Sequence, residues 1–466
     1  MKKWLLWGLL WLGSCLVSGC VIQPLSPPEG TTIPVRGAAG LGDTLFPNAG
    51  NGGYDVQHYD LDLTANVDDN IITSTATLTA VATLTLDAFN LDFHALEIDA
   101  LSVNGVETPY ERQEDELIID PAAPLPADAV FTVSVRYHGK PNAIGTSGWL
   151  NYLGRVAVTN GSLGAATWYP LNNHASDRAT YSYRIKVPPT YMALVNGQLL
   201  GQESDASGWT TYRWATDSPM ISAEGALMIG RYVLQSSTTD PAGTLVSIYR
   251  EQSTTEGSLR RLEHMPDMLA LLNEVVGPYP FPSYSVVIHT RSAPYANFQQ
   301  ELSILSLAVL TDYGEEAVMN GLSFQYFGNS VGIAQRQDLW LIQGLGGYLG
   351  WFWIEKSKGP AALQTMVQRI HNGYSLDFPP AAPATAHDLD NDSIYFRAPM
   401  AIHALRLRLG DERFFQLLRT FYARYRGDNA STADFIAVAE EVSGEDLTEF
   451  FQAWLYDDKL PPLPAN

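Results

Sequence analysis

The chain has 466 residues, with 28 Lys and Arg against 50 Asp and Glu, which gives a formal net charge of −22. That length and a hydrophobic content of 46% suit two or three globular domains with full cores. The acidity excludes a nucleic-acid-binding role, because the chain lacks the clustered cations that would replace phosphate counterions.

The first 20 residues are typical of a bacterial lipoprotein signal peptide. Lys2 and Lys3 precede an apolar run over residues 4–12, and residues 16–20 read LVSGC, which resembles a lipobox. Cleavage there would leave Cys20 as the new N-terminus, with a diacylglycerol on its thiol. A plain signal-anchor helix is the alternative, but the apolar run is short for a membrane span. We therefore expect an extracytoplasmic protein anchored by lipid in the cell membrane or the outer membrane.

Residues 21–53 and the stretch that follows them differ in pattern. The first is rich in Pro, Gly and Thr without apolar periodicity, which predicts a flexible tether. From residue 54 to about residue 232 the period is two, as where Thr75, Thr77 and Thr79 alternate with Ala and Leu. Hairpin-type turns are indicated at residues 104–105 and 196–197, both Asn-Gly. These features predict a β domain, antiparallel in its pairing, over residues 54–240.

Beyond residue 240 the apolar period lengthens to that of helices. A stripe of Leu, Met and Val runs from Leu259 to Val276, and a short strand is predicted at residues 285–290. Further helices are predicted over residues 315–327, 361–370, 401–409, 414–425 and 433–442. Ser431 and Asp434 form a candidate capping box for the last helix, and Gly444 follows its end. Residues 241–466 are therefore expected to be α-rich with a small β element.

Histidine spacing excludes one kind of metal site without any alignment. Of the nine histidines, the closest are 16 positions apart, at His371, His387 and His403. No helix can present two histidines one turn apart, as zinc hydrolases with an HExxH motif require. A zinc site built from scattered residues such as His174, His289 or His387 stays conceivable, although no local spacing supports it.

Several stretches in chain order share the pattern of one enzyme family. Residues 168–180 read WYPLNNHASDRAT, residues 277–281 GPYPF, residues 327–331 FGNSV and residues 338–341 DLWL. The first of these resembles W-x-P-x-N-D-H-P-S-D-K-A-T of the zinc aminopeptidase N family, which includes the leukotriene A hydrolases. The others resemble the lead into that family's active-site strand and the segments around its zinc site. The resemblance implies an α+β fold, in which a β saddle domain precedes an α-rich, thermolysin-like (gluzincin) domain.

The resemblance also implies where the zinc site should be, and this chain lacks it. Aligned on Phe-Gly-Asn, the HExxH positions are Asn320, Gly321 and Phe324, so both histidines and the general base are absent. The third ligand of the family is a Glu, and Gln343 stands there as a neutral amide, a poor zinc ligand. We therefore predict no cofactor, although zinc is the cofactor of the family.

Two further family positions give a mixed result. The family's G-x-M-E-N loop, whose Glu binds the substrate amine, corresponds to residues 296–301, ANFQQE. In the simplest register Gln299 replaces that Glu, and a slip of two residues would restore the role to Glu301, so Gln299, Gln300 and Glu301 are all candidates for lining the substrate cleft. Tyr395 matches the tyrosine that stabilises the tetrahedral oxyanion in the family.

Other motifs point less clearly to chemistry. Residues 328–332, GNSVG, satisfy the G-x-S-x-G pattern, but a predicted helix rather than a strand precedes the serine, Ser330. Residues 388–393, DLDNDS, open like a calcium loop but lack its Gly and Glu. The aromatic cluster around Trp340 and Trp351 is expected in the helical core or along a cleft.

The loss of every zinc ligand from a recognisable domain predicts a pseudo-metallopeptidase. We expect a lipoprotein, tethered to the membrane through Cys20, that binds peptides or proteins without cutting them. The alternative is a hydrolase with an unconventional metal site, or a metal-independent one that uses Tyr395 and nearby carboxylates.

Overall fold

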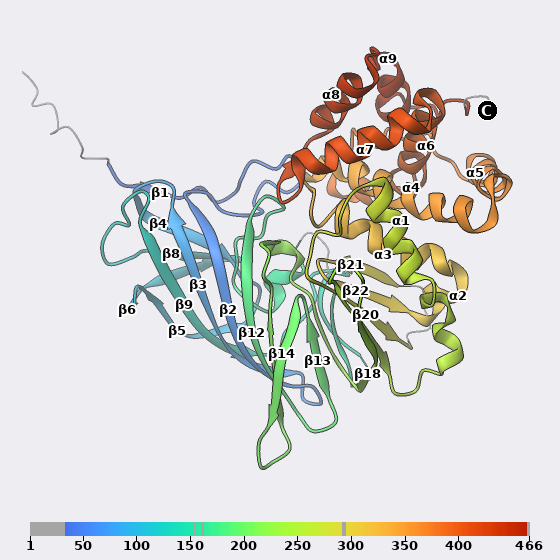
Figure 1. Ribbon diagram of the computed structural model, residues 1–466. Helices are drawn as coiled ribbons and strands as arrows, with labels where there is room; N and C mark the ends of the chain where they lie inside the picture. The colour runs from blue at the N-terminus through green and yellow to red at the C-terminus, as the bar shows by residue number, and fades with distance from the viewer. Residues whose placement is uncertain (1–32, 153, 160–162, 291–294, 464–466) are drawn as a thin grey trace, which may run out of the picture. The chain divides into compact units, whose positions relative to one another are not determined.

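The alternation of Thr with Ala and Leu in the first half produces long paired strands in the computed structural model, which describes residues 33–152, 154–159, 163–290 and 295–463. Ala76, Leu78 and Ala80 are buried on one face of β3 (Ile71–Ala82), as the period of two predicts. β3 belongs to a nine-stranded sheet (Figure 1). Its other strands are β2 (Tyr54–Asn66), β5 (Glu97–Val103), β6 (Val106–Glu107), β9 (Val130–Gly139), β12 (Arg178–Val187), β14 (Gln198–Ser204), β15 (Thr210–Ala215) and β16 (Met220–Ile221).

This sheet is mixed rather than purely antiparallel. β2 pairs with β3 in the antiparallel sense, but its other neighbour, β12, runs parallel to it. A parallel pair needs a long crossover, and more than a hundred residues separate these two strands. The α+β class is confirmed, and the antiparallel description holds for every other pairing in the nine-stranded sheet.

Two four-stranded sheets complete the first half. One contains β1 (Val35–Arg36), β4 (Leu86–Asp92), β7 (Tyr110–Gln113) and β8 (Glu116–Ile119). The other contains β10 (Gly148–Asn151), β11 (Val156–Thr159), β13 (Met192–Val195) and β17 (Leu227–Gly230). The Asn104-Gly105 turn joins β5 to β6 as predicted. The hairpin predicted at Asn196-Gly197 is wrong, because it connects strands of two different sheets.

Residues 34–53 are not a flexible tether. Asp43 is only 2% exposed and accepts a hydrogen bond of 3.0 Å from the backbone N–H of Arg336. Asn51 is fully buried, and its amide donates to the Asp92 carboxylate at 2.9 Å. The prediction fails here because buried polar contacts hold the segment, and such contacts leave no periodic pattern. The signal segment, Cys20 and the first part of the predicted tether lie outside the described residues.

A five-stranded sheet separates the two hydrophobic cores. It contains β18 (Tyr232–Thr239), β19 (Leu245–Glu251), β20 (Ser283–His289), β22 (Leu302–Ser306) and, at its edge, β21 (Ala296–Gln299). Along β20, Val287 belongs to the core of the first half, whereas Val286 and Ile288 belong to the helical core. The boundary expected at residue 240 falls between β18 and β19, which pair in this sheet.

Helices build the rest of the chain (Figure 1). They are α1 (Met265–Val275), α2 (Leu307–Asp312), α3 (Glu315–Tyr326), α4 (Leu339–Lys358), α5 (Pro360–Gly373), α6 (Ala398–Leu409), α7 (Asp411–Tyr425), α8 (Thr432–Ser443) and α9 (Thr448–Phe451). β23 (Gly332–Ile333) and β24 (Asn429–Ala430) form a short parallel pair between them. The capping box of Ser431 and Asp434 and the left-handed Gly444 at the end of α8 are confirmed. No helix in the described ranges has the length and hydropathy to cross a membrane.

Candidate functional site

A cavity of about 590 Å³ opens among β21, α3 and α4. The structure brings five of the predicted positions together on its wall. These are Gln299, Asn320, Phe324, Gln343 and Tyr395. Strand β21 supplies the first, α3 the next two, α4 the fourth, and the π-helical turn Ser393–Arg397 the last.

Gly321, at the position of the general base, leaves no room for a side chain. A Cβ added to Gly321 would lie 2.8 Å from the Ser303 Oγ and 2.8 Å from the Tyr284 hydroxyl oxygen. The Tyr284 hydroxyl donates to Ser303 at 2.8 Å, so the two groups also hold each other in place. The space that a catalytic carboxylate would need is therefore occupied by β20 and β22.

Phe324 fills the space at the second ligand position. Its ring lies 5.3 Å from the Phe298 ring, centroid to centroid, across the cavity wall. A Cβ added to Gly346 of α4 would lie 2.7 Å from the Phe324 ring. The aromatic side chain is thus accommodated by a glycine on the facing helix.

Asn320 is accommodated in the same way one turn earlier on α3. A Cβ added to Gly350 would lie 1.9 Å from the Asn320 Oδ1 and 3.5 Å from the Cγ of Glu316. Both side chains therefore extend over one glycine of α4. The Asn320 Oδ1 is buried and accepts no hydrogen bond within the described part of the chain.

The residues at the end of β21 divide between cavity and core. Gln299 is 2% exposed, and its amide donates to the Glu224 carboxylate, while its Oε1 has no partner in the described ranges. Gln300 donates instead to the backbone carbonyl of Ser218 and does not line the cavity. Of the two registers, only the one with Gln299 at the substrate-amine position thus has its residue on the cavity wall.

Glu301 points away from the cavity, so its assignment to the substrate cleft is wrong, as it is for Gln300. Its backbone turns out of the strand at a φ of 60°, and its carboxylate accepts a hydrogen bond of 2.6 Å from the Ser283 hydroxyl. Burial raises the pKa of Glu301 to about 7. A turn at the strand end breaks the alternation, which is why the sequence pattern could not separate these three residues.

Tyr395 is the one predicted catalytic side chain that reaches the cavity with its chemistry intact. It is 40% exposed, and burial together with the nearby Asp390 carboxylate raises its pKa above the usual value. Two residues later, the fully buried Arg397 anchors the same π-helical turn. The phenol is therefore protonated at neutral pH and available as a hydrogen-bond donor.

Comparison with known proteins identifies the family of the chain. The model of the Peptidase M1 N-terminal domain matches residues 55–223, and that of the Peptidase family M1 domain matches residues 310–454. The chain belongs to peptidase family M1. Its resemblance to the aminopeptidase N family, predicted from the motifs, is thereby confirmed.

The share of each relative that this chain matches differs from one relative to the next. Aminopeptidase M1-B of rice (Oryza sativa subsp. japonica) is 24% identical over 64% of this chain, but the match spans only 36% of that protein. Leukotriene A-4 hydrolase of Xenopus laevis is 22% identical over 63% of this chain and 51% of its own length. The M1 zinc metallopeptidase of Deinococcus radiodurans has a solved structure with a TM-score of 0.84 and 25% identity, covering 91% of this chain and 99% of that one.

The side chains at the ligand positions do not fit the zinc ion of the family. Zinc takes Cys, His or carboxylate ligands, whereas Asn320 and Gln343 offer neutral amides and Phe324 offers an aromatic ring. Across the described ranges, no group of three His, Cys, Asp or Glu side chains is placed to hold a metal ion. The packing of Phe324 against Gly346 carries this conclusion, because it fills the volume where a ligand would have to reach.

The histidines considered as scattered ligands lie apart from the cavity wall. His174 lies beside Asp43, with 4.0 Å between its Nε2 and the carboxylate. His289 ends β20, and His387 lies in the short turn Ala386–Asp390. None of the three belongs to the cavity lining among the described residues.

The other two motifs have structural roles. Ser330 follows α3, a helix, so the strand-to-serine turn of a nucleophile elbow is not formed. The Asp388 carboxylate caps the turn that follows Thr385. It accepts hydrogen bonds from the backbone N–H and the hydroxyl of Thr385, at 2.7 and 3.0 Å. Its carboxylate is thereby used within its own loop.

Three charged residues on the cavity wall were missed by sequence reasoning. They are Glu224, Glu316 and Arg336. Glu316 could have been found, because it precedes Asn320 by one helical turn and so shares its face. Glu224 and Arg336 are brought to the wall by long-range packing, for which a single sequence carries no signal.

Proposed function

We propose that this member of peptidase family M1 is a catalytically inactive binding protein that holds peptides or protein segments in the former substrate cavity. The observation that carries the proposal is the close packing of α3 against α4. There Phe324 packs on Gly346, and Asn320 packs on Gly350. Without a base at Gly321 and without zinc ligands, the wall lacks the groups that activate water in this family. The cavity itself remains open.

A peptide is the ligand class that the cavity fits best. Aromatic and amide side chains both line its wall, which suits the apolar side chains and the backbone of an extended peptide. A mutant of the related metallopeptidase of D. radiodurans has been solved with a bound Tyr-Ser-Ala substrate. We further propose that the lipid on Cys20 holds the chain at the extracytoplasmic surface of a membrane, in the cell membrane or the outer membrane.

A retained hydrolase is the competing function, and one observation favours it. Tyr395 shares the cavity wall with the carboxylates of Glu316 and Asp390, which supplies a proton donor and candidate bases in one place. No nucleophile stands between them on the described part of the wall. The binding function therefore ranks first.

The test is metal content and turnover of the detergent-extracted full chain, measured beside the D. radiodurans enzyme. We expect zinc well below one ion per chain and no cleavage of aminoacyl-arylamides or of a mixed peptide library, with peptides nevertheless retained on the protein. Stoichiometric zinc with turnover abolished by a chelator would contradict the proposal. Metal-independent turnover that Tyr395→Phe abolishes would establish the competing hydrolase.

A further inference from the structure

Two side chains of α3 with hydrogen-bond acceptors extend over a glycine of α4. Glu316 and Asn320 are one helical turn apart, and both line the cavity. Gly350 lies beneath them, with its ideal Cβ position 1.9 Å from the Asn320 Oδ1. The absence of a side chain at Gly350 leaves both groups at the cavity wall rather than covered by α4.

The acceptors on this wall exceed the donors. The Oδ1 of Asn320 and the Oε1 of Gln299 are buried without a hydrogen-bond partner within the described ranges, and Gln299 itself is 2% exposed. No described Lys, Arg or His nitrogen forms an ion pair with Glu316. Burial raises the pKa of its carboxyl, and Trp351 and the more distant charges of Lys358 and Arg369 only partly offset that rise. Buried acceptors without donors are costly, so a ligand that supplies N–H groups would bind favourably here.

The surrounding surface suits a cation rather than a neutral donor. Trp351 follows Gly350 on α4, and Trp351, Tyr313 and Phe324 all line the cavity. Aromatic faces attract ammonium and guanidinium groups, and the attraction strengthens where water is excluded. Arg336 is the only described Lys or Arg on the wall, and its charge lies close to Asp43 and Glu224, which offset it.

We propose that the cavity recognises a basic side chain, whose ammonium or guanidinium donates to Glu316 and Asn320 above Gly350. The inference rests on the proposed peptide-binding function and names the residue type that the peptide must carry. The cation is assigned to a side chain rather than to a free α-amine, because Gln299 is neutral and its own amide is already bonded to Glu224. A basic segment also complements a chain with a net charge of −22.

The experiment is isothermal titration of the detergent-extracted full chain with four small probes. Nα-acetyl-arginine amide and Nα-acetyl-lysine amide carry the side-chain cation, Nα-acetyl-citrulline amide is the neutral isostere, and norleucine amide carries only a free α-amine. We expect the arginine and lysine probes to bind about tenfold or more tightly than the other two. Equal binding of the citrulline probe, or no heat from any probe at millimolar concentration, would overturn the inference.

Matched variants on one helix locate the site. Glu316→Gln should weaken the arginine probe about tenfold or more. The neighbouring Glu315→Gln should not, because the Glu315 carboxylate accepts from the Trp353 indole at 2.9 Å and does not line the cavity. Unchanged binding by Glu316→Gln would refute this site, and the citrulline comparison stands even if that variant fails to fold. Tightest binding of norleucine amide would assign the cation to an α-amine instead.

The possible outcomes distinguish a failure of this inference from a failure of the proposed peptide-binding function. If peptides are retained uncleaved but the basic probes show no preference, only the inference about the side chain fails. If peptides are cleaved, the proposed function fails, whatever the probes show.

Discussion

Arg397 and Asn320 both lie in the helical half of the chain, but their polar atoms are paired in opposite ways. Arg397 is fully buried, and its guanidinium donates to seven backbone carbonyls, those of Leu376, Phe378, Ala453, Trp454, Asp457, Asp458 and Lys459. The Asn320 Oδ1 is also buried, yet it accepts no hydrogen bond in the described ranges. The first arrangement stabilises the fold, whereas the second costs stability until a ligand supplies a donor.

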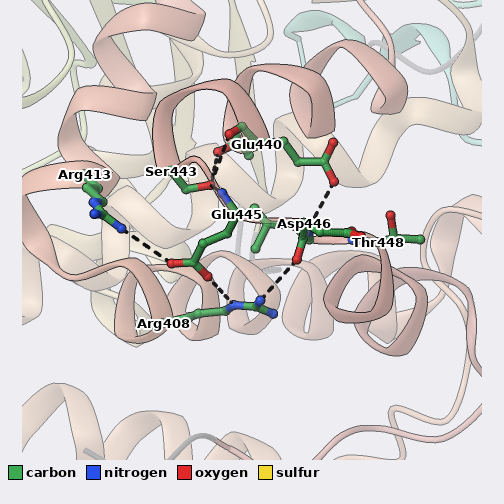
Figure 2. A network of polar contacts seen from close by, with 9 residues as sticks. Arg408, Arg413, Glu440, Ser443, Glu445, Asp446 and Thr448 are labelled. Atoms are coloured by element: carbon green, nitrogen blue, oxygen red, sulfur yellow. Dashed lines mark hydrogen bonds and ion pairs between the residues drawn. The ribbon is translucent and has the colours of Figure 1, made fainter.

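The C-terminal helices show the paired arrangement repeatedly. Arg406 binds the carboxylates of Asp411 and Glu355 at 2.7 and 2.8 Å, and the hydroxyl of Tyr348 at 2.9 Å. Figure 2 shows a second network, in which Arg408 and Arg413 both reach Glu445, at 3.1 and 3.5 Å. These paired charges stabilise the packing of the C-terminal helices, and Arg397 bonds the turn that carries Tyr395 to the C-terminal segment.

The largest expected effect comes from breaking the paired arrangement at Arg397. Arg397→Met would leave buried carbonyls without donors, so the free energy of unfolding should fall by about 4 kcal/mol or more. Thermal and urea unfolding measure the loss. Arg424→Met is the control, because Arg424 pairs with Glu441 at the exposed surface and should change stability little. Equal losses in the two variants would show that the carbonyl cluster around Arg397 is not what stabilises this region.

Glu301 is only half paired. One oxygen of its carboxylate accepts a hydrogen bond from Ser283, and the other has no partner in the described part of the chain. Its pKa is about 7 in the folded protein against an ordinary value of 4.5, so the folded state binds more protons between these pH values. The free energy of unfolding therefore falls as the pH rises from 4.5 to about 7. Glu301→Gln removes this pH-dependent contribution. The free energy of unfolding of the variant, relative to that of the wild type, should therefore rise by about 2–3 kcal/mol across that pH range.

The difference between variant and wild type is the quantity to measure for Glu301. Glu116 and Asp177, whose pKa values burial also raises to about 7, are present in both proteins and cancel in it. Glu263→Gln, at an exposed carboxylate, is the control for the substitution itself. A difference for Glu301→Gln that does not change with pH would show that this carboxyl is not held protonated by burial.

The smallest effect on stability is expected at Asn320. Asn320→Leu removes an acceptor that has no donor, so stability should change by less than about 1 kcal/mol or rise slightly, while the arginine probe loses its binding. Asn329→Leu on the same cavity wall should instead cost about 1–2 kcal/mol, because the Asn329 amide donates to the Phe298 carbonyl at 3.2 Å. A large loss in Asn320→Leu would show that its amide already has a stabilising partner.

Local sequence rules predicted the elements that local interactions determine. The alternation around Thr77 produced β3, and the pairing of Ser431 with Asp434 produced the start of α8. That the zinc ligands of the family are replaced follows from residue types alone, because no packing can turn Phe324 into a metal ligand. The cavity brings Asn320, Phe324 and Gln343 together as the motif register implied.

Long-range packing determined the parts that were missed. α4 is apolar on nearly every side and contains several glycines, so it has no amphipathic stripe to reveal a helix. The Asn196 amide donates to the Gln300 carbonyl and accepts from the Ala226 N–H, so its Asn-Gly pair tethers distant segments instead of closing a hairpin. The roles of Glu224 and Arg336 depend on contacts of the same kind.

The glycines opposite Phe324 and Asn320 also make the zinc ligands of the family hard to introduce into this chain. Each pair is interlocked, so a change on α3 alone would leave a gap or a clash against α4, and a change at Gly346 or Gly350 alone would collide with α3. A side chain at Gly321 would further require Ser303 and Tyr284 to move. Introducing the ligands one at a time would therefore pass through less stable variants, so the packing of α3 against α4 favours the residues that are present.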